Sequence, residues 1–219
     1  MARLARVVIP GVPHHIVQRG NRRQKVFFNE ADRVEYLKIL RRQSFDFGLK
    51  IWAYCLMDNH VHMIVVPEKE ESLARGIGET NRLYTRRIHF REGWKGYLWQ
   101  GRFGSYPLDE MHLYNAVRYV ERNPVRARIV KAATEYRWSS ARSHKEKIKD
   151  ELLDEFYLIN EIHDWNAYLE QREDEEDLAI FRSHEKTGRP LGGVDFIRRL
   201  ERVSGRILQK RKPGPKGRN

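Results

Sequence analysis

The stretch from Met57 to Val66, with the sequence MDNHVHMIVV, constrains the fold of this chain more than any other. An Asp-Asn pair between two apolar, β-prone runs is typical of a tight hairpin turn, because both residue types tolerate positive φ angles. The strand after the turn should begin at about His60, and side chains alternate across a strand, so His60 and His62 should share one face. At about 3.3 Å per residue, their Cα atoms would lie about 7 Å apart, and both rings could then bind one metal ion. Alternatively, both are ordinary polar positions on a half-buried strand.

Periodic patterns around this hairpin predict an α+β domain. Strands are expected over residues 14–18 and 49–57, besides the one that begins at His60, and residues 97–106 should form a further strand or a pair of short ones. Helices are expected over residues 30–47 and 72–91. Gly48 should end the first helix and Ser72 should cap the second. The order strand, helix, strand, strand, helix, strand predicts an antiparallel sheet of ferredoxin-like kind with both helices packed on one face. We expect the other face of the sheet to be open to a ligand.

A further helix is expected from Asp109 to Arg122. Tyr119 and Asn123 are four residues apart, so they would be neighbours on one flank of this helix, whereas Tyr114 would lie on the opposite flank. Pro124 disfavours a helical conformation at the residue before it, so the helix should stop at Asn123. Asn123 is therefore either part of a site with Tyr119 or only the cap of the helix.

The charge of the chain indicates a polyanionic partner. It carries 42 Lys and Arg against 30 Asp and Glu, a formal net charge of +12. Each Lys or Arg that meets a phosphate releases counterions, so nucleic acid is the expected partner. The candidate DNA-binding residues are Arg19, Arg22, Arg23, Lys25, Arg82, Arg86, Trp99, Arg102, Lys210, Arg211 and Lys212. The alternatives are a solvated basic surface for the cations and a place in the hydrophobic core for the aromatic ring.

The charges also divide the chain into parts. Residues 150–177 hold twelve Asp or Glu against one Arg, residues 178–219 hold twelve Lys or Arg against three acidic residues, and residues 1–149 keep a net charge of +14. We expect a basic domain over residues 1–149, a mainly helical C-terminal extension over residues 150–208, acidic and then basic, and a basic, disordered tail over residues 209–219.

Cysteine content and hydropathy indicate the compartment. Cys55 is the only cysteine, which argues against a disulfide framework and fits a reducing cytoplasm. No apolar run has the length of a membrane span, and prolines and histidines interrupt residues 1–20, where a signal peptide would need an apolar stretch. We expect a cytoplasmic protein that does not enter a membrane.

Several of these motifs resemble one known family. DNHVHMIVV, followed by YVERNPVRA from Tyr119 onward, resembles the HUH single-tyrosine transposases, and specifically the REP-associated tyrosine transposases. WQGRF, YRWSSARSH and TGRPLGGVDFIRRLE are similar to that subgroup too, so the resemblance spans essentially the whole chain. It implies a catalytic domain over residues 1–149 and a prokaryotic protein associated with the nucleoid.

The resemblance also implies roles for individual residues. His60 and His62 take the place of the HUH pair, Tyr119 that of the nucleophile, and Asn123 that of the residue that completes the metal site. The implied cofactor is a divalent metal ion, Mg²⁺ or Mn²⁺. His14, His15, His89 and His112 are not included in this metal set.

The implied chemistry is cleavage and rejoining of single-stranded hairpin DNA from palindromic repeats through a 5′-phosphotyrosine. The bond energy stays in the ester, so no nucleotide cofactor is required, and the chain has no phosphate-binding glycine loop. The alternatives are a domesticated relative that binds hairpin DNA without cutting it and an RNA-binding sheet module of similar topology. The REP-associated subgroup is expected to act as a monomer, whereas insertion-sequence relatives work as dimers, so the sequence leaves the oligomeric state open.

Overall fold

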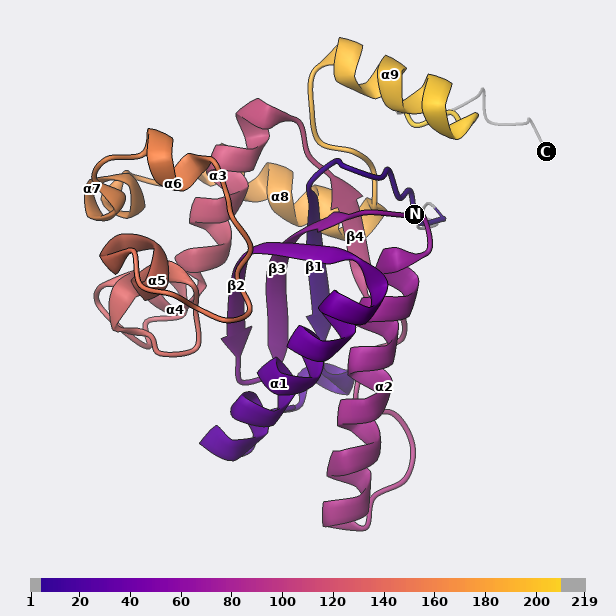
Figure 1. Ribbon diagram of the computed structural model, residues 1–219, viewed down its shortest axis with the longest axis vertical. Helices are drawn as coiled ribbons and strands as arrows, with labels where there is room; N and C mark the ends of the chain where they lie inside the picture. The colour runs from indigo at the N-terminus through magenta and orange to yellow at the C-terminus, as the bar shows by residue number, and fades with distance from the viewer. Residues whose placement is uncertain (1–4, 210–219) are drawn as a thin grey trace, which may run out of the picture.

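A four-stranded antiparallel sheet forms the centre of the computed structural model, which describes residues 5–209 (Figure 1). Its strands are β1 (His14–Arg19), β2 (Leu49–Met57), β3 (His60–Pro67) and β4 (Gly104–Pro107). They lie in the order β2-β3-β1-β4, and each neighbouring pair is antiparallel. The predicted ferredoxin-like order and the turn at Asp58 and Asn59 are both confirmed.

Helices α1 (Glu30–Phe47) and α2 (Ser72–Glu92) pack together on one face of the sheet, as predicted (Figure 1). Gly48 ends α1 in the left-handed conformation, with a φ of 60° that residues with a Cβ atom rarely adopt. The predicted cap at Ser72 is wrong in detail. Ser72 is already the first helical residue, and its hydroxyl accepts a hydrogen bond from the Lys69 amide, outside the helix.

The other face of the sheet is covered, so the prediction of an open face is wrong. Helices α3 (Glu110–Glu121) and α8 (Glu175–Thr187) lie against this face, on the side opposite α1 and α2 (Figure 1). The cover is needed because this face carries apolar side chains such as Cys55 and Ile64, both with no exposed surface. This face of the sheet is therefore not an open surface for a ligand.

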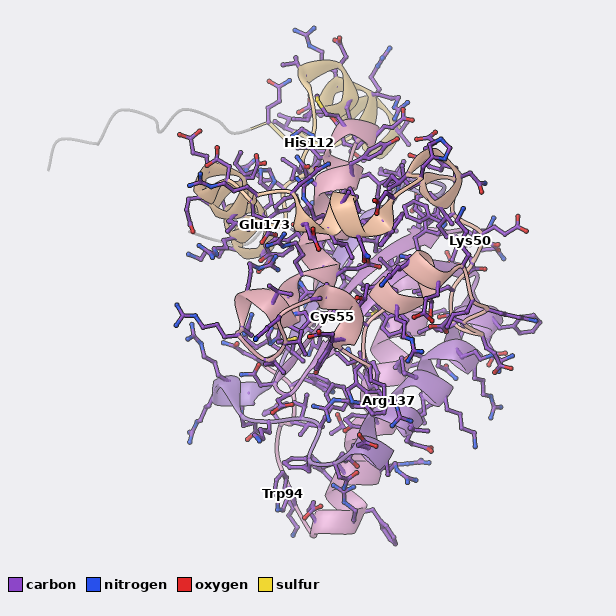
Figure 2. All side chains as sticks on the ribbon, turned by 90° about the vertical axis from the view of Figure 1, so that its left-hand side faces the viewer. Lys50, Cys55, Trp94, His112, Arg137 and Glu173 are labelled. Carbon is purple, nitrogen blue, oxygen red and sulfur yellow. The ribbon has the colours of Figure 1, made fainter. Side chains whose placement is uncertain are left out.

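The predicted strand over residues 97–106 is mostly a loop. Only its last part pairs, as β4, and an isolated bridge joins Trp99 to Gly20. Gly101, within this range, has a positive φ angle of 65°, which does not fit an extended strand. This loop folds back on the C-terminal part of α2, and Trp94, at its start, lies at the opposite end of the molecule from His112 on α3 (Figure 2).

The C-terminal extension is helical and contains α6 (Leu158–Glu161), α7 (Trp165–Glu170), α8 and α9 (Val194–Ser204). The remaining short helices, which precede it, are η1 (Asn21–Arg23), α4 (Asn123–Arg126), η2 (Ala133–Glu135) and α5 (Ala141–Glu146). Helix α9 packs on the N-terminal segment, where Leu200 and Leu208 join Val7 and Ile9 in a small apolar cluster. Within the described part of the chain, we find no helix with the length and apolar character to cross a membrane.

A buried polar network fixes α3 to this extension. Glu121 has no exposed surface, and its Oε1 accepts a hydrogen bond from Ser140 Oγ at 2.6 Å and lies 2.6 Å from His144 Nδ1. Its Oε2 accepts a hydrogen bond from Trp165 Nε1 at 2.8 Å. These contacts hold the C-terminal end of α3 at one position relative to α5 and α7.

Candidate active site

Strand register determines which side chains meet on the covered face of the sheet. His62 on β3 lies opposite Val17 on β1, and His60 lies opposite Arg19, so all four side chains point to the same face. Arg19 thereby places a cation beside the two histidines.

The two histidines of β3 lie side by side and are largely buried. Their ring centroids are 5.0 Å apart, and His60 Nδ1 lies 2.6 Å from Asn59 Oδ1. Burial, together with the nearby Arg19 charge, lowers the pKa of His60 to about 3, and burial also holds the pKa of His62 well below its ordinary value. Both rings are therefore neutral at physiological pH, which is the form of histidine that binds a metal ion.

Tyr119 and Asn123 approach these histidines from α3 and the start of α4. The Tyr119 ring lies 5.7 Å from the His62 ring, centroid to centroid, and only 7 % of the residue is exposed. The Asn123 side-chain nitrogen donates hydrogen bonds of 3.1 Å to the carbonyls of Tyr119 and Val120. Its oxygen is left for other partners, and the Asn123 side chain lies close enough to His60 to affect the pKa of that ring. The structure thus brings together the four residues singled out in the sequence.

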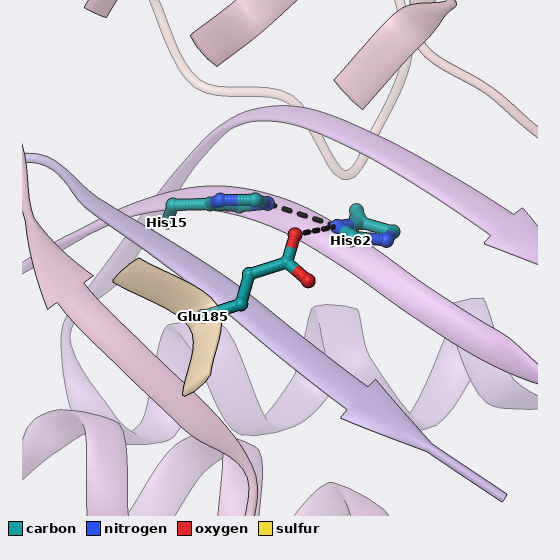
Figure 3. A group of neighbouring side chains, drawn as sticks. All are labelled: His15, His62 and Glu185. Carbon is teal, nitrogen blue, oxygen red and sulfur yellow. Dashed lines mark hydrogen bonds and ion pairs between the residues drawn. The ribbon is translucent and has the colours of Figure 1, made fainter. Parts of the chain in front are cut away.

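Two further side chains, which the sequence did not single out, complete this group (Figure 3). His15 Nε2 lies 2.9 Å from His62 Nδ1, and Glu185 Oε1, from α8, lies 3.9 Å from the same atom. His15 Nδ1 is in turn 2.6 Å from the Tyr106 hydroxyl. His14 and His15 point to opposite strand faces, so one of them could be expected near the site, but the register that selects His15 is a tertiary feature. For Glu185 the sequence carries no signal.

The environment of Tyr119 is tightly packed. Its ring stacks on Phe181 of α8 at 4.8 Å, and the Arg126 guanidinium lies 4.1 Å from the ring centroid on another side. The hydroxyl donates a hydrogen bond to Glu185 Oε1 at 3.1 Å. Burial, reinforced by the Glu185 carboxylate, raises the pKa of Tyr119. The hydroxyl is therefore protonated at neutral pH and needs an acceptor before it can act as a nucleophile.

A cleft of about 680 Å³ leads to this tyrosine, and we call it the tyrosine cleft. Its polar lining includes Tyr119, Glu185, Arg19, Arg23, Arg102, Arg182 and Lys186. Three of the predicted DNA-binding residues, Arg19, Arg23 and Arg102, thus line the entrance to the nucleophile. Arg22 and Lys25 are exposed in the same basic loop, and Lys25 pairs with Asp58 at 3.3 Å.

A second cleft, of about 890 Å³, lies between α2 and the loop before β4, and we call it the α2 cleft. Arg82, Arg86, Trp99 and Arg102 are among its lining residues. Trp99 is only 7 % exposed and belongs to the hydrophobic core, where its Nε1 donates a hydrogen bond to the Asn81 carbonyl. The packing therefore favours the core alternative for this ring. Lys210, Arg211 and Lys212 lie outside the described residues.

Comparison with solved structures supports the fold. The structure of a REP-associated tyrosine transposase bound to a REP hairpin superposes with a TM-score of 0.53 at 20 % sequence identity, covering 71 % of this chain and 93 % of that chain. A putative transposase from Deinococcus radiodurans R1 matches with a TM-score of 0.38 at 20 % identity, covering 55 % of this chain and 97 % of that chain. A search of curated proteins found no significant match.

Comparison with protein families gives the stronger result. The family described as "Transposase IS200 like" matches residues 10–123, a segment that contains the sheet, the two histidines of β3, Tyr119 and Asn123. The matched segment makes up more than half of the 219 residues. This protein therefore belongs to the IS200-like transposase family.

Proposed function

We propose that this protein is a metal-dependent tyrosine transposase that cleaves and rejoins single-stranded hairpin DNA. The observation that carries the proposal is the Tyr119 hydroxyl, held 3.1 Å from a carboxylate and beside two neutral histidines, in a cleft lined by cations. A tyrosine in this position has a proton acceptor next to its hydroxyl and side chains that can bind a metal ion nearby. The cleft also gives a phosphodiester access to the hydroxyl. The structural neighbour bound to a REP hairpin supports hairpin DNA as the substrate class.

In the proposed reaction Tyr119 Oη attacks the scissile phosphorus. A phosphotyrosine bond forms to the 5′ side of the downstream strand, the bond from phosphorus to the 3′ oxygen breaks, and that oxygen leaves as a hydroxyl after gaining a proton. Glu185 is the acceptor closest to the attacking hydroxyl and takes its proton. Attack by a 3′-hydroxyl on the phosphotyrosine reverses these steps, so the reaction consumes no nucleotide cofactor.

The residues of the site fit a divalent metal ion. His60, His62 and Asn123 would hold it, because two neutral imidazoles and an amide oxygen suit Mn²⁺ or Mg²⁺. The bound ion would polarise the phosphodiester and orient it for attack. His15 supports this assignment. If His62 Nδ1 donates to His15 Nε2, the tautomer is fixed and His62 Nε2 is left unprotonated for the metal.

A competing set of donors shares one of these histidines. The ligand atoms of His15, His62 and Glu185 lie within 4.8 Å of one another. We favour the set with His60 and Asn123, because the Glu185 carboxylate is already bonded to the Tyr119 hydroxyl. Helix α3 packs on the sheet of its own chain and holds Tyr119 beside His62, an arrangement that supports cleavage in cis by a monomer.

A covalent-adduct assay tests the proposal. A hairpin oligonucleotide with unpaired flanks is labelled at its 3′ end, because a 5′-phosphotyrosine retains the downstream fragment. Incubation with Mn²⁺ or Mg²⁺ should give a labelled protein band that resists denaturation, and both Tyr119→Phe and a chelator should abolish it. Tyr114→Phe is the matched control, because Tyr114 lies on the opposite flank of α3, bonded to Glu161.

The outcomes separate the proposal from its alternatives. Tight, salt-sensitive hairpin binding with no adduct under any condition would favour the domesticated, non-catalytic protein. An adduct that survives Tyr119→Phe would show that another residue is the nucleophile.

A further inference from the structure

Gln18 carries a buried acceptor without a partner. The residue is 2 % exposed, and its Oε1 has no hydrogen-bond partner among residues 5–209. Its Nε2 donates a hydrogen bond to the Gly101 carbonyl at 3.2 Å. This bond distinguishes the nitrogen of the side-chain amide from its oxygen. An unpaired buried acceptor destabilises a protein, so its presence calls for a donor that the described chain does not supply.

The position of Gln18 explains how such a donor can reach it. Strand β4 pairs with β1 only as far as Val17 and Gly104, so Gln18 lies just beyond the end of β4, near the edge of the sheet. It lines both the tyrosine cleft and the α2 cleft, as does Arg102. The two clefts are therefore neighbours, and a strand whose phosphate lies at Tyr119 can continue past Gln18 into the α2 cleft.

The walls of the α2 cleft suit unpaired nucleotides. Arg82 and Arg86 line it from successive turns of α2, with His89 on the following turn, and Arg82 also pairs with Glu79. Tyr97, in the opposite wall, is 81 % exposed and offers a ring on which a base can stack. Arginines beside an exposed aromatic ring are typical of single-stranded nucleic acid binding.

We propose that the α2 cleft holds unpaired nucleobases of the strand that reaches Tyr119, and that Gln18 Oε1 accepts a hydrogen bond from an N–H of one base. This inference rests on the proposed function and adds a base-reading residue to it. The donor is an exocyclic amine of adenine or cytosine or an N–H of guanine or thymine, since all of these are strong hydrogen-bond donors. Gln18 thereby contributes to the choice of the sequence beside the hairpin.

Equilibrium binding tests the inference without cleavage. In the Tyr119→Phe protein, fluorescence anisotropy measures the affinity for hairpin oligonucleotides in which each unpaired base is replaced in turn by an analogue that lacks one N–H donor. We expect a loss of about 5- to 150-fold at one position, as for other base contacts. Methionine has no amide oxygen, so adding Gln18→Met should abolish the loss of affinity caused by the analogue at that position. The affinities measured with analogues at the other positions should not change.

Two further measurements distinguish recognition of a base by Gln18 from an effect of Gln18 on the stability of the protein. Gln18→Met should change the melting temperature of the free protein little, because it removes the unpaired acceptor together with the hydrogen bond to the Gly101 carbonyl. Arg86→Gln should weaken binding of all sequences alike and lower the salt dependence. Arg87→Gln should not, because Arg87, also on α2, faces Glu35 of α1 at 3.8 Å.

The outcomes distinguish this inference from the proposed function. An equal loss for the same analogue with and without Gln18→Met, or no loss at any position, would overturn the inference alone. Failure of the Tyr119→Phe protein to bind any hairpin would contradict the proposed function itself.

Discussion

The hydroxyl of Tyr119 donates a hydrogen bond of 3.1 Å to Glu185 Oε1, although the two residues are 66 positions apart in the chain. Glu185 belongs to α8, outside the segment that matches the IS200-like family, so the chain's own C-terminal extension contributes a carboxylate to the site. The carboxylate is mostly buried, with 17 % of its side chain exposed, and burial raises its pKa above the ordinary range. It therefore binds a proton more readily than a carboxylate in water would.

Glu185→Gln tests whether this carboxylate accepts the tyrosine proton. The amide cannot take up a proton, so adduct formation should slow by about 10²- to 10⁴-fold, the usual contribution of a general base. Hairpin affinity should change little, which filter binding or anisotropy can confirm. Glu161→Gln is the matched control, because Glu161 bonds the hydroxyl of Tyr114 on the far flank of α3. Unchanged adduct kinetics in Glu185→Gln would assign the carboxylate to another role.

Calorimetric titration with Mn²⁺ distinguishes the two donor sets that share His62. His60→Ala and Asn123→Ala should weaken binding most. His15→Ala should cost about 10- to 100-fold, as expected for a residue that orients a ligand. His163→Ala, at an exposed position, serves as the control. A larger loss from His15→Ala than from His60→Ala would instead assign the ion to His15, His62 and Glu185.

Acid should destabilise the folded protein through its buried histidines. Burial lowers the pKa of His14 to about 4 and that of His15 to about 3, from 6.5 in the unfolded chain. Their contribution to stability is therefore fully present above pH 6.5 and is lost as the pH falls below it, because only the unfolded chain then binds the protons. Each histidine should contribute up to about 1.4 kcal/mol per pH unit.

Urea denaturation at pH 7, 6 and 5 measures this slope, and His14→Gln should make it shallower. His14 Nδ1 lies 2.7 Å from the Val12 carbonyl, and its Nε2 accepts a hydrogen bond from the Ile9 amide, so the neutral ring is held by the backbone. The exposed His163→Gln is the matched control. An identical slope in His14→Gln would mean that other groups cause the acid sensitivity.

Glu121→Ala should destabilise the protein by about 3–5 kcal/mol, the usual cost of removing one member of a buried ion pair such as Glu121 and His144. The change removes the acceptor shared by Ser140 and Trp165 and the carboxylate beside His144, and it loosens the end of α3 that carries Tyr119. Denaturant titration measures the loss. Glu146→Ala, in an exposed pair with Arg142, should cost less than about 1 kcal/mol.

The sequence predicted those features that depend on local patterns. The bounds of α1, β2 and the start of β3 follow from periodicity and turn residues, and the spacing of Tyr119 and Asn123 follows from the helical repeat. The structure places both of these residues beside His60 and His62. The family resemblance carried the assignment of their roles, which stays a prediction for the experiments above.

Features that depend on how distant segments pack could not be predicted in this way. The cover of α8 over the sheet is not encoded in any local pattern, so neither the closed face nor Glu185 was expected. Trp99 was a candidate DNA-binding residue because aromatic residues alternate with Arg102 in this stretch, yet its ring packs against Tyr36 and Tyr84. The unpaired acceptor of Gln18 likewise becomes visible only when all its neighbours are placed.

The separation of 66 positions between Tyr119 and Glu185 also sets an order of events during synthesis. At about 5–20 residues per second, a ribosome reaches Glu185 about 3–13 s after it has added Tyr119. The growing chain thus contains both histidines of β3 and the tyrosine before it contains the carboxylate that bonds the tyrosine hydroxyl. A product of premature termination within this interval would keep the proposed nucleophile but lack its proton acceptor.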